Sequence, residues 1–135
     1  MTAITTRPVR DSTASLLRFA LRADATLCGA VGLFTAMAAD PLSRLSGLSA
    51  TSEWIAGAAL VGYGLALYVA AGARGVRRVG VGVLVGNIAF AVLVAVVLIA
   101  GWLPLTGLGV VSTIAFTVAT LAFAYAQYHG VRRLA

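Results

Sequence analysis

The chain has 135 residues, of which 61% are hydrophobic and only 10% are charged. Soluble domains carry about 25% charged residues, so this composition excludes an ordinary soluble domain and predicts a membrane protein. The net charge of +6 comes from ten arginines and four acidic residues, and the chain has no lysine. These arginines flank apolar segments, so we interpret them as determinants of membrane orientation and expect no nucleic acid partner.

Four apolar segments follow one another along the chain. Each is long enough to cross the hydrocarbon core of a bilayer, which needs about 20 helical residues. Backbone amides inside lipid must be paired within the segment, so we expect helices. The segments are residues 20–39, 53–73, 79–102 and 105–128. The sequence therefore predicts an all-α, polytopic membrane four-helix bundle over residues 20–135, with no room for a separate soluble domain.

A basic N-terminal segment, residues 1–19, precedes the first span. We expect residues 1–11 to be disordered and the remainder to form an interfacial helix, because leucines alternate there with Arg18 and Arg22. Such a helix rests on anionic lipid headgroups. An alternative is a signal peptide, because Ala36-Met37-Ala38 resembles a signal-peptidase site. Cleavage there would leave three spans.

The arginines lie mostly on one side of the predicted spans. Arg44 is the only one in the first opposite loop, and the second opposite loop, residues 101–107, has no charge. Short arginine-rich loops stay in the cytoplasm. We therefore expect both termini to be cytoplasmic in a bacterial inner membrane. The nine arginines assigned to the cytoplasmic side are Arg7, Arg10, Arg18, Arg22, Arg74, Arg77, Arg78, Arg132 and Arg133.

Three short patterns recur in the same order and predict a bundle built from two repeated helical hairpins. A Pro-Leu pair closes spans one and three, at Pro41 and Pro104, and a Gly-Leu pair follows each of them. The sequence Gly-Val-Arg-Arg ends each half, at residues 75–78 and 130–133. Such hairpins would be parallel repeats related by an axis along the membrane normal. The alternative is that proline, glycine and arginine simply recur at membrane boundaries.

The repeat places two polar residues at the same depth. Asp24 lies seventeen residues before Pro41, and Asn87 lies seventeen residues before Pro104. This spacing corresponds to ~25 Å of helix in both cases, at a rise of 1.5 Å per residue. We therefore expect Asp24 and Asn87 together in the cytoplasmic quarter of the bilayer.

A carboxylate in a membrane span is costly, so Asp24 needs a partner or a function. One interpretation is a structural clasp between the hairpins, in which Asp24 pairs with Arg22, Arg77 or Asn87. The other is a proton or cation site on a transport path. Tyr63 joins the candidate intramembrane polar site with Asp24, Asn87 and Arg22, because its hydroxyl lies deep in a span and needs a partner.

The remaining polar residues indicate no chemistry. Cys28 and His129 are each the only residue of their type, so no disulfide or metal set can be built, and no nucleophile–base pair is visible. We expect no catalytic residue, no metal and no cofactor. Capping and the helix dipole explain Glu53 at the start of span two. Gln127 and His129 belong to the inner end of span four.

Glycines are frequent in the predicted spans. The pair Gly82-x-x-x-Gly86 in span three is a small-residue packing motif that lets helix backbones approach closely. This pattern favours a compact bundle, a homo-oligomer or a place in a larger membrane complex.

The chain as a whole resembles the small, uncharacterised four-helix integral membrane proteins of actinobacteria. The resemblance covers most of residues 16–133. It rests on Arg22-x-Asp24-Ala25, Gly32, Asn87 and the turn Pro104-Leu105-Thr106-x-Leu108-Gly109. It implies a four-helix inner-membrane fold and no particular activity.

Together these features predict a non-enzymatic integral membrane protein. We expect an accessory or assembly subunit that packs through small-residue helix faces. The alternative is a small oligomeric transporter or channel for a proton, an ion or a small solute, using Asp24 and Asn87.

Overall fold

The computed structural model describes residues 7–134, and all regular secondary structure in this range is helical. The elements are α1 (Arg7–Met37), α2 (Ala39–Ser46), α3 (Ala50–Ala70), α4 (Val76–Ala100) and α5 (Gly107–Arg133). All but α2 contain a stretch long and apolar enough to cross a membrane. The prediction of an all-α protein with four spans is confirmed, and a membrane location follows from it.

The first span begins earlier than the sequence predicts. Helix α1 begins at Arg7, and its candidate span begins at Ala14, not at residue 20. Leu17 is fully buried. This part of the N-terminal segment therefore packs among the helices instead of lying on the membrane surface. The prediction of disorder for residues 1–11 is wrong for residues 7–11, which belong to α1, and residues 1–6 lie outside the described residues.

The first outer loop contains a helix that the sequence analysis did not predict. Pro41 was expected to close the first span, but it lies in the first turn of α2, where proline is tolerated because its missing N–H would have no partner in the helix. Gly47 ends α2 with a left-handed backbone (φ 88°), and its N–H donates to the Ser43 carbonyl. The second outer loop contains no helix and turns at Pro104, where the Leu105 N–H donates to the Leu103 carbonyl at 2.8 Å, so the two loops differ in structure.

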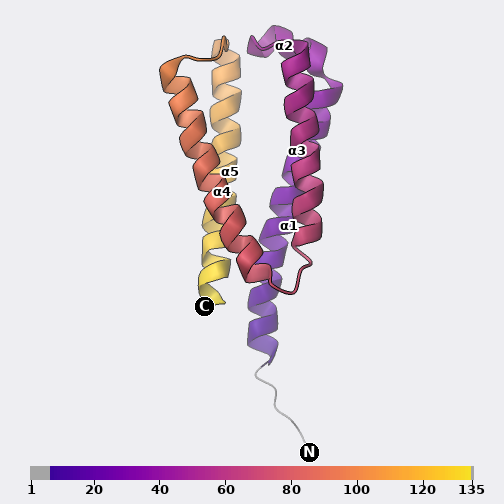
Figure 1. Cartoon of the computed structure of the whole chain (residues 1–135), viewed down its shortest axis with the longest axis vertical. Helices are drawn as coiled ribbons and strands as arrows, with labels where there is room; N and C mark the ends of the chain where they lie inside the picture. The colour runs from indigo at the N-terminus through magenta and orange to yellow at the C-terminus, as the bar shows by residue number, and fades with distance from the viewer. Residues whose placement is uncertain (1–6, 135) are drawn as a thin grey trace, which may run out of the picture.

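The four long helices form two pairs, α1 with α3 and α4 with α5, which stand side by side (Figure 1). The α1–α3 pair is the more intimate one, because glycines let its backbones approach. A Cβ added at Gly57 would lie 2.5 Å from the Ala36 nitrogen, and one added at Gly64 would lie 2.7 Å from the Ala25 carbonyl oxygen. These positions therefore accept only glycine without movement of a backbone.

The buried core joins the two pairs near the end where the arginines lie. It consists of Leu17, Leu21, Ala25, Leu67, Ala71, Val76 and Val131. Side chains of Leu17 fill the space beside Gly80 and Gly130, which brings α1 against α4 and α5. Arg18 donates to the carbonyls of Ala71 and Ala73 at 2.7 and 2.9 Å, so its charge satisfies carbonyls just after the end of α3.

A second contact joins the pairs at the opposite end. The Thr106 backbone N–H donates to the Ser46 carbonyl at 2.8 Å, and the Thr106 hydroxyl donates to the Leu45 carbonyl. The same hydroxyl oxygen accepts from the Gly109 N–H and caps α5. Thr106 thus caps α5 in one helix pair and binds the end of α2 beside the other pair.

Replacing Gly57 with alanine should separate the α1–α3 pair. The new Cβ would collide with the backbone of α1, so we expect the Gly57→Ala variant to lose about 1–3 kcal/mol of unfolding free energy, the usual cost of overpacking. Thermal unfolding in detergent measures the loss. Gly62→Ala on the same helix is the control, because a Cβ there would meet nothing within 4 Å. Equal melting of the two variants would contradict the close approach.

Candidate functional site

Three polar side chains from three helices meet between the helix pairs. Asp24 of α1 is 2% exposed, Asn87 of α4 is 6% exposed, and Gln127 of α5 is fully buried. The Gln127 Nε2 donates to Asp24 Oδ2 at 2.8 Å, and the Asn87 Nδ2 donates to the same oxygen at 3.3 Å. Asn87 Nδ2 also donates to Gln127 Oε1 at 3.1 Å. We call Asp24, Asn87 and Gln127 the polar cluster.

Helix geometry completes the surroundings of the carboxylate. Cys28 lies one turn after Asp24 on α1, so its thiol faces the same way and approaches Asp24 Oδ1 at 3.5 Å. Within the described part of the chain, all the donors to Asp24 are therefore neutral groups. Oδ2 accepts two carboxamide bonds, whereas Oδ1 accepts only a weak thiol contact.

The structure brings only part of the predicted site together. Asp24 and Asn87 are hydrogen-bonded, which agrees with the prediction that both residues lie at the same depth in the bundle. Arg22 is not in the cluster: it is exposed, and its guanidinium lies 5.1 Å from the centre of the Tyr68 ring. A side chain that long reaches the aromatic surface of α3 more easily than the buried carboxylate of its own helix. Arg77 is exposed as well and gives Asp24 no partner.

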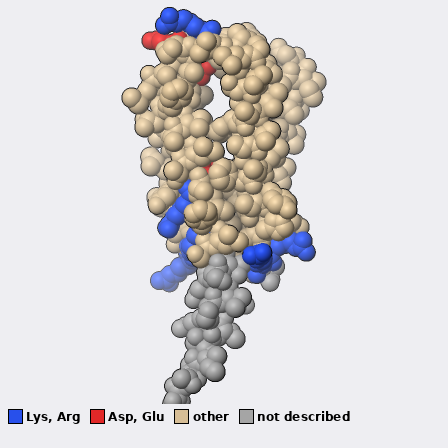
Figure 2. All heavy atoms as spheres, turned by 180° about the vertical axis from the view of Figure 1, so that it is seen from behind, with Lys and Arg blue, Asp and Glu red and all other residues tan. Residues whose placement is uncertain are grey.

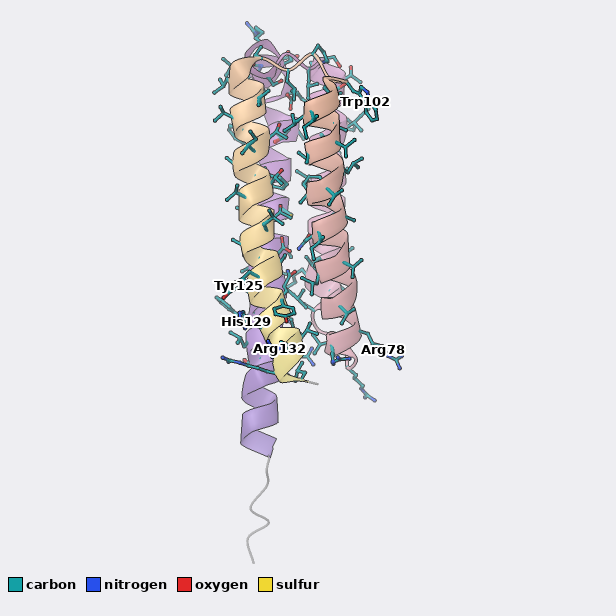
Figure 3. All side chains as sticks on the ribbon, turned by 90° about the vertical axis from the view of Figure 1, so that its left-hand side faces the viewer. Arg78, Trp102, Tyr125, His129 and Arg132 are labelled. Atoms are coloured by element: carbon teal, nitrogen blue, oxygen red, sulfur yellow. The ribbon has the colours of Figure 1, made fainter. Side chains whose placement is uncertain are left out.

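The other predicted residues lie at the edges of the molecule. Tyr63 is 41% exposed and does not join the polar cluster, although it lines a cavity beside it. Five of the arginines assigned to the cytoplasmic side, in the inner loop and at the C-terminal end, are exposed, and Figure 3 shows two of them, Arg78 and Arg132, at the same end of the molecule, where Figure 2 shows a group of basic side chains. Trp102 lies at the opposite end (Figure 3). The exposed inner arginines are Arg74, Arg77, Arg78, Arg132 and Arg133.

Gln127 is the cluster member that the sequence analysis missed. It was assigned, together with His129, to the inner end of span four. Depth would have been the useful signal: Gln127 lies five residues before Arg132, in the same inner part of its span that Asp24 occupies after Arg22. A fully buried glutamine at that depth needs a polar partner from another helix.

A cavity of about 210 Å³ lies against the polar cluster. Its polar lining comes from Asp24, Asn87, Tyr63, Thr120 and Cys28, and its apolar lining comes from Leu60, Gly86, Phe90 and Phe116. The rings of Phe90 and Phe116 meet edge to face with centres 6.1 Å apart. A larger space of about 500 Å³ continues toward the outer end and shares Leu60 and Phe116 with the first. Figure 2 shows the opening between the two helix pairs.

Glu53 has a different role from the one predicted. The N-cap of α3 is Ser49, whose hydroxyl accepts from the Ser52 N–H. Glu53 lies in the first turn, 7% exposed, and its carboxylate accepts a hydrogen bond from the Ser46 hydroxyl. The favourable dipole position remains. Capping alone is therefore not enough to explain Glu53, which also fixes the end of α2 against α3.

Fold and site together define a class: an integral membrane protein with a buried polar cluster between two helix pairs. Comparison with known protein families, curated proteins and solved structures finds no match to this chain. The functional argument therefore depends on the geometry itself.

The polar cluster should stabilise the junction of the helix pairs. Replacing Gln127 with leucine removes one donor to Asp24 and one of the two acceptors of the Asn87 amide. We expect a loss of about 1–2 kcal/mol of unfolding free energy in detergent, the range of interhelical hydrogen bonds in membrane proteins. Thermal unfolding checks this value. Thr117→Val on α5 is the control, because the Thr117 hydroxyl bonds only to its own helix, at the Thr113 carbonyl. Unchanged melting of Gln127→Leu would contradict a structural role.

Proposed function

We propose that the protein is a non-enzymatic structural subunit of a membrane assembly. The observation that carries this proposal is the hydrogen bonding among the members of the polar cluster. Asp24, Asn87 and Gln127 bind one another across three helices, and among the residues whose side chains are described no buried side-chain nitrogen or oxygen lacks a partner. Groups used in this way hold α1 against α4 and α5.

The outer surface of α4 supports an assembly role. This helix is the most apolar of the four and the least buried. Gly82 and Ala89 lie on one exposed face, about two helical turns apart, and a Cβ added at Gly82 would meet nothing within 4 Å. Small residues of this kind let a second helix approach closely in lipid. We infer that the face binds α4 of a second copy of the chain.

The proposal includes an origin by duplication of a helical hairpin. The hydrogen bond between Asp24 and Asn87 supports the equal depth that the repeat predicts. The different outer loops, helical α2 in one half and a short non-helical turn in the other, mean that any duplication has diverged there. The resemblance to small actinobacterial membrane proteins belongs to the same proposal.

The orientation proposed is a bacterial inner membrane with both termini cytoplasmic. Its support is the collection of exposed arginines at one end of the molecule, with Trp102 at the other (Figure 3). The cytoplasmic arginines would contact anionic lipid headgroups.

A small oligomeric transporter or channel is the second candidate function. The cavity beside Asp24 is the observation that favours it, because an intramembrane carboxylate facing a cavity is a common element of transport paths. Uptake of a proton, ion or small solute into proteoliposomes that depends on Asp24 would select this function over the structural one.

Orientation can be read from cysteine labelling. In a Cys28→Ser background, we expect Ser49→Cys in the outer loop to react with a membrane-impermeant maleimide in intact spheroplasts. Gly75→Cys in the inner loop should react only after permeabilisation. Both positions are exposed and neither change removes an arginine. Labelling of Gly75→Cys in intact spheroplasts would contradict the proposed topology.

Self-association tests the structural role. We expect the wild type to be a dimer or larger when subunits are counted by single-molecule photobleaching in liposomes, and Gly82→Leu to be monomeric because leucine fills the close-approach surface of α4. Gly62→Leu is the control on α3, since Gly62 is equally open. A monomeric wild type, or a Gly82→Leu variant that stays oligomeric, would refute the α4 interface.

A further inference from the structure

The cavity beside the polar cluster combines one buried carboxylate with apolar and aromatic walls. Asp24 lies at its inner end, Phe90 and Phe116 form part of its wall, and Tyr63 lines it as well. From these residues we infer that the cavity is a binding site for a small lipophilic amine, with its ammonium group on Asp24 and its apolar body between the helix pairs. This inference concerns binding and goes beyond the structural role proposed above.

The charge of Asp24 is the first argument. An ionised carboxylate in the membrane interior is costly unless a cation balances it. The donors that Asp24 has in the described part of the chain, two carboxamides and a thiol, carry no charge. Arg22 points to the ring of Tyr68 instead. A ligand that brings one positive charge would complete the site.

The two carboxylate oxygens of Asp24 have different hydrogen-bond partners. Oδ2 is held by Asn87 and by Gln127, and Gln127 is fully buried and does not line the cavity. Oδ1 faces Cys28, which does line it. An ionised carboxylate oxygen has two acceptor positions. Because the only donor to Oδ1 is a weak thiol contact, this oxygen has acceptor capacity left on the side of the cavity.

The residues that line the cavity fit an organic cation better than a metal ion. Hard metal ions such as Ca²⁺ take six to eight oxygen ligands, whereas Asp24 supplies the only carboxylate in this cavity. Among the described residues no group of three His, Cys, Asp or Glu side chains could hold a metal. Aromatic faces attract an ammonium group and also accept an apolar body. These walls therefore favour an organic ammonium ion over a metal ion.

The size and position of the cavity set the ligand class. Its volume of about 210 Å³ is below the range of about 300–1,000 Å³ that is usual for drug-sized ligands. The ligand is therefore small, with one ring or a short branched chain. Figure 2 shows an opening between the helix pairs on the side of the bundle, and an amine dissolved in the surrounding membrane would enter the cavity through it.

Binding of radiolabelled benzylamine to the full chain in nanodiscs tests the inference, with benzyl alcohol as the neutral probe of the same shape. We expect saturable binding of benzylamine to the wild type above the uptake by empty nanodiscs, and at least tenfold weaker binding of benzyl alcohol. Asp24→Asn should weaken benzylamine binding at least tenfold. An asparagine can keep its carbonyl oxygen toward Asn87 and Gln127, so this variant removes the charge and retains the cluster.

A second variant keeps the test decisive if Asp24→Asn does not fold. A Cβ added at Gly86 would meet nothing within 4 Å, and a longer side chain there would extend into the cavity that this glycine lines. Gly86→Leu should therefore also weaken benzylamine binding at least tenfold, whereas Gly62→Leu on the outside of α3 should bind like the wild type. No saturable binding to the wild type, equal binding of the two probes, or full binding by Gly86→Leu would overturn the inference. The subunit counting of Gly82→Leu and the melting of Gln127→Leu do not depend on this result.

Discussion

A carboxylate inside the apolar part of a membrane protein must be given hydrogen-bond donors, and this requirement organises the inner half of the molecule. Asp24 could obtain donors only from other helices or from its own next turn. Asn87 and Gln127 supply them from α4 and α5, and Cys28 adds a contact from α1. Because a buried polar group without a partner is costly, the three helices are held in one register. The apolar core around Leu17 then packs beside a junction that the polar cluster has fixed.

The two helix pairs are joined at their ends and separated in the middle. At one end the polar cluster and Leu17 connect them, and at the other end Thr106 binds the carbonyls of Leu45 and Ser46. Between these junctions lie the two connected cavities. Within the α1–α3 pair, glycines allow backbone contact. Between the pairs, Leu60 and Phe116 line both cavities.

Much of this structure can be predicted from the sequence, because it follows from one-dimensional patterns. Span length, helical form and the arginine asymmetry need only hydropathy and counting. The juxtaposition of Asp24 and Asn87 needed one further step, their equal distance from a proline. Helix α2 escaped prediction because a proline after a span was interpreted as a stop, although it also fits the first turn of a new helix. Arg22 was placed in the site by proximity in sequence, but its length allowed it to reach Tyr68.

Gln127 illustrates what the sequence patterns leave undetermined, namely the rotation of a helix about its own axis. Which face of α5 meets Asp24 depends on how that helix is rotated, and the nearly uniform apolarity of the spans gives little information about rotation. In the structure, α5 is rotated so that Gln127, a polar side chain at the depth of Asp24, donates to this carboxylate. The same geometry explains how one residue can serve two roles. Asp24 Oδ2 is committed to the helix junction, whereas Oδ1 lies on the side of the cavity with a single weak donor. Stability and ligand binding therefore depend on different oxygens of one carboxylate, so a change in its charge and a change in its amide partners should have separable effects.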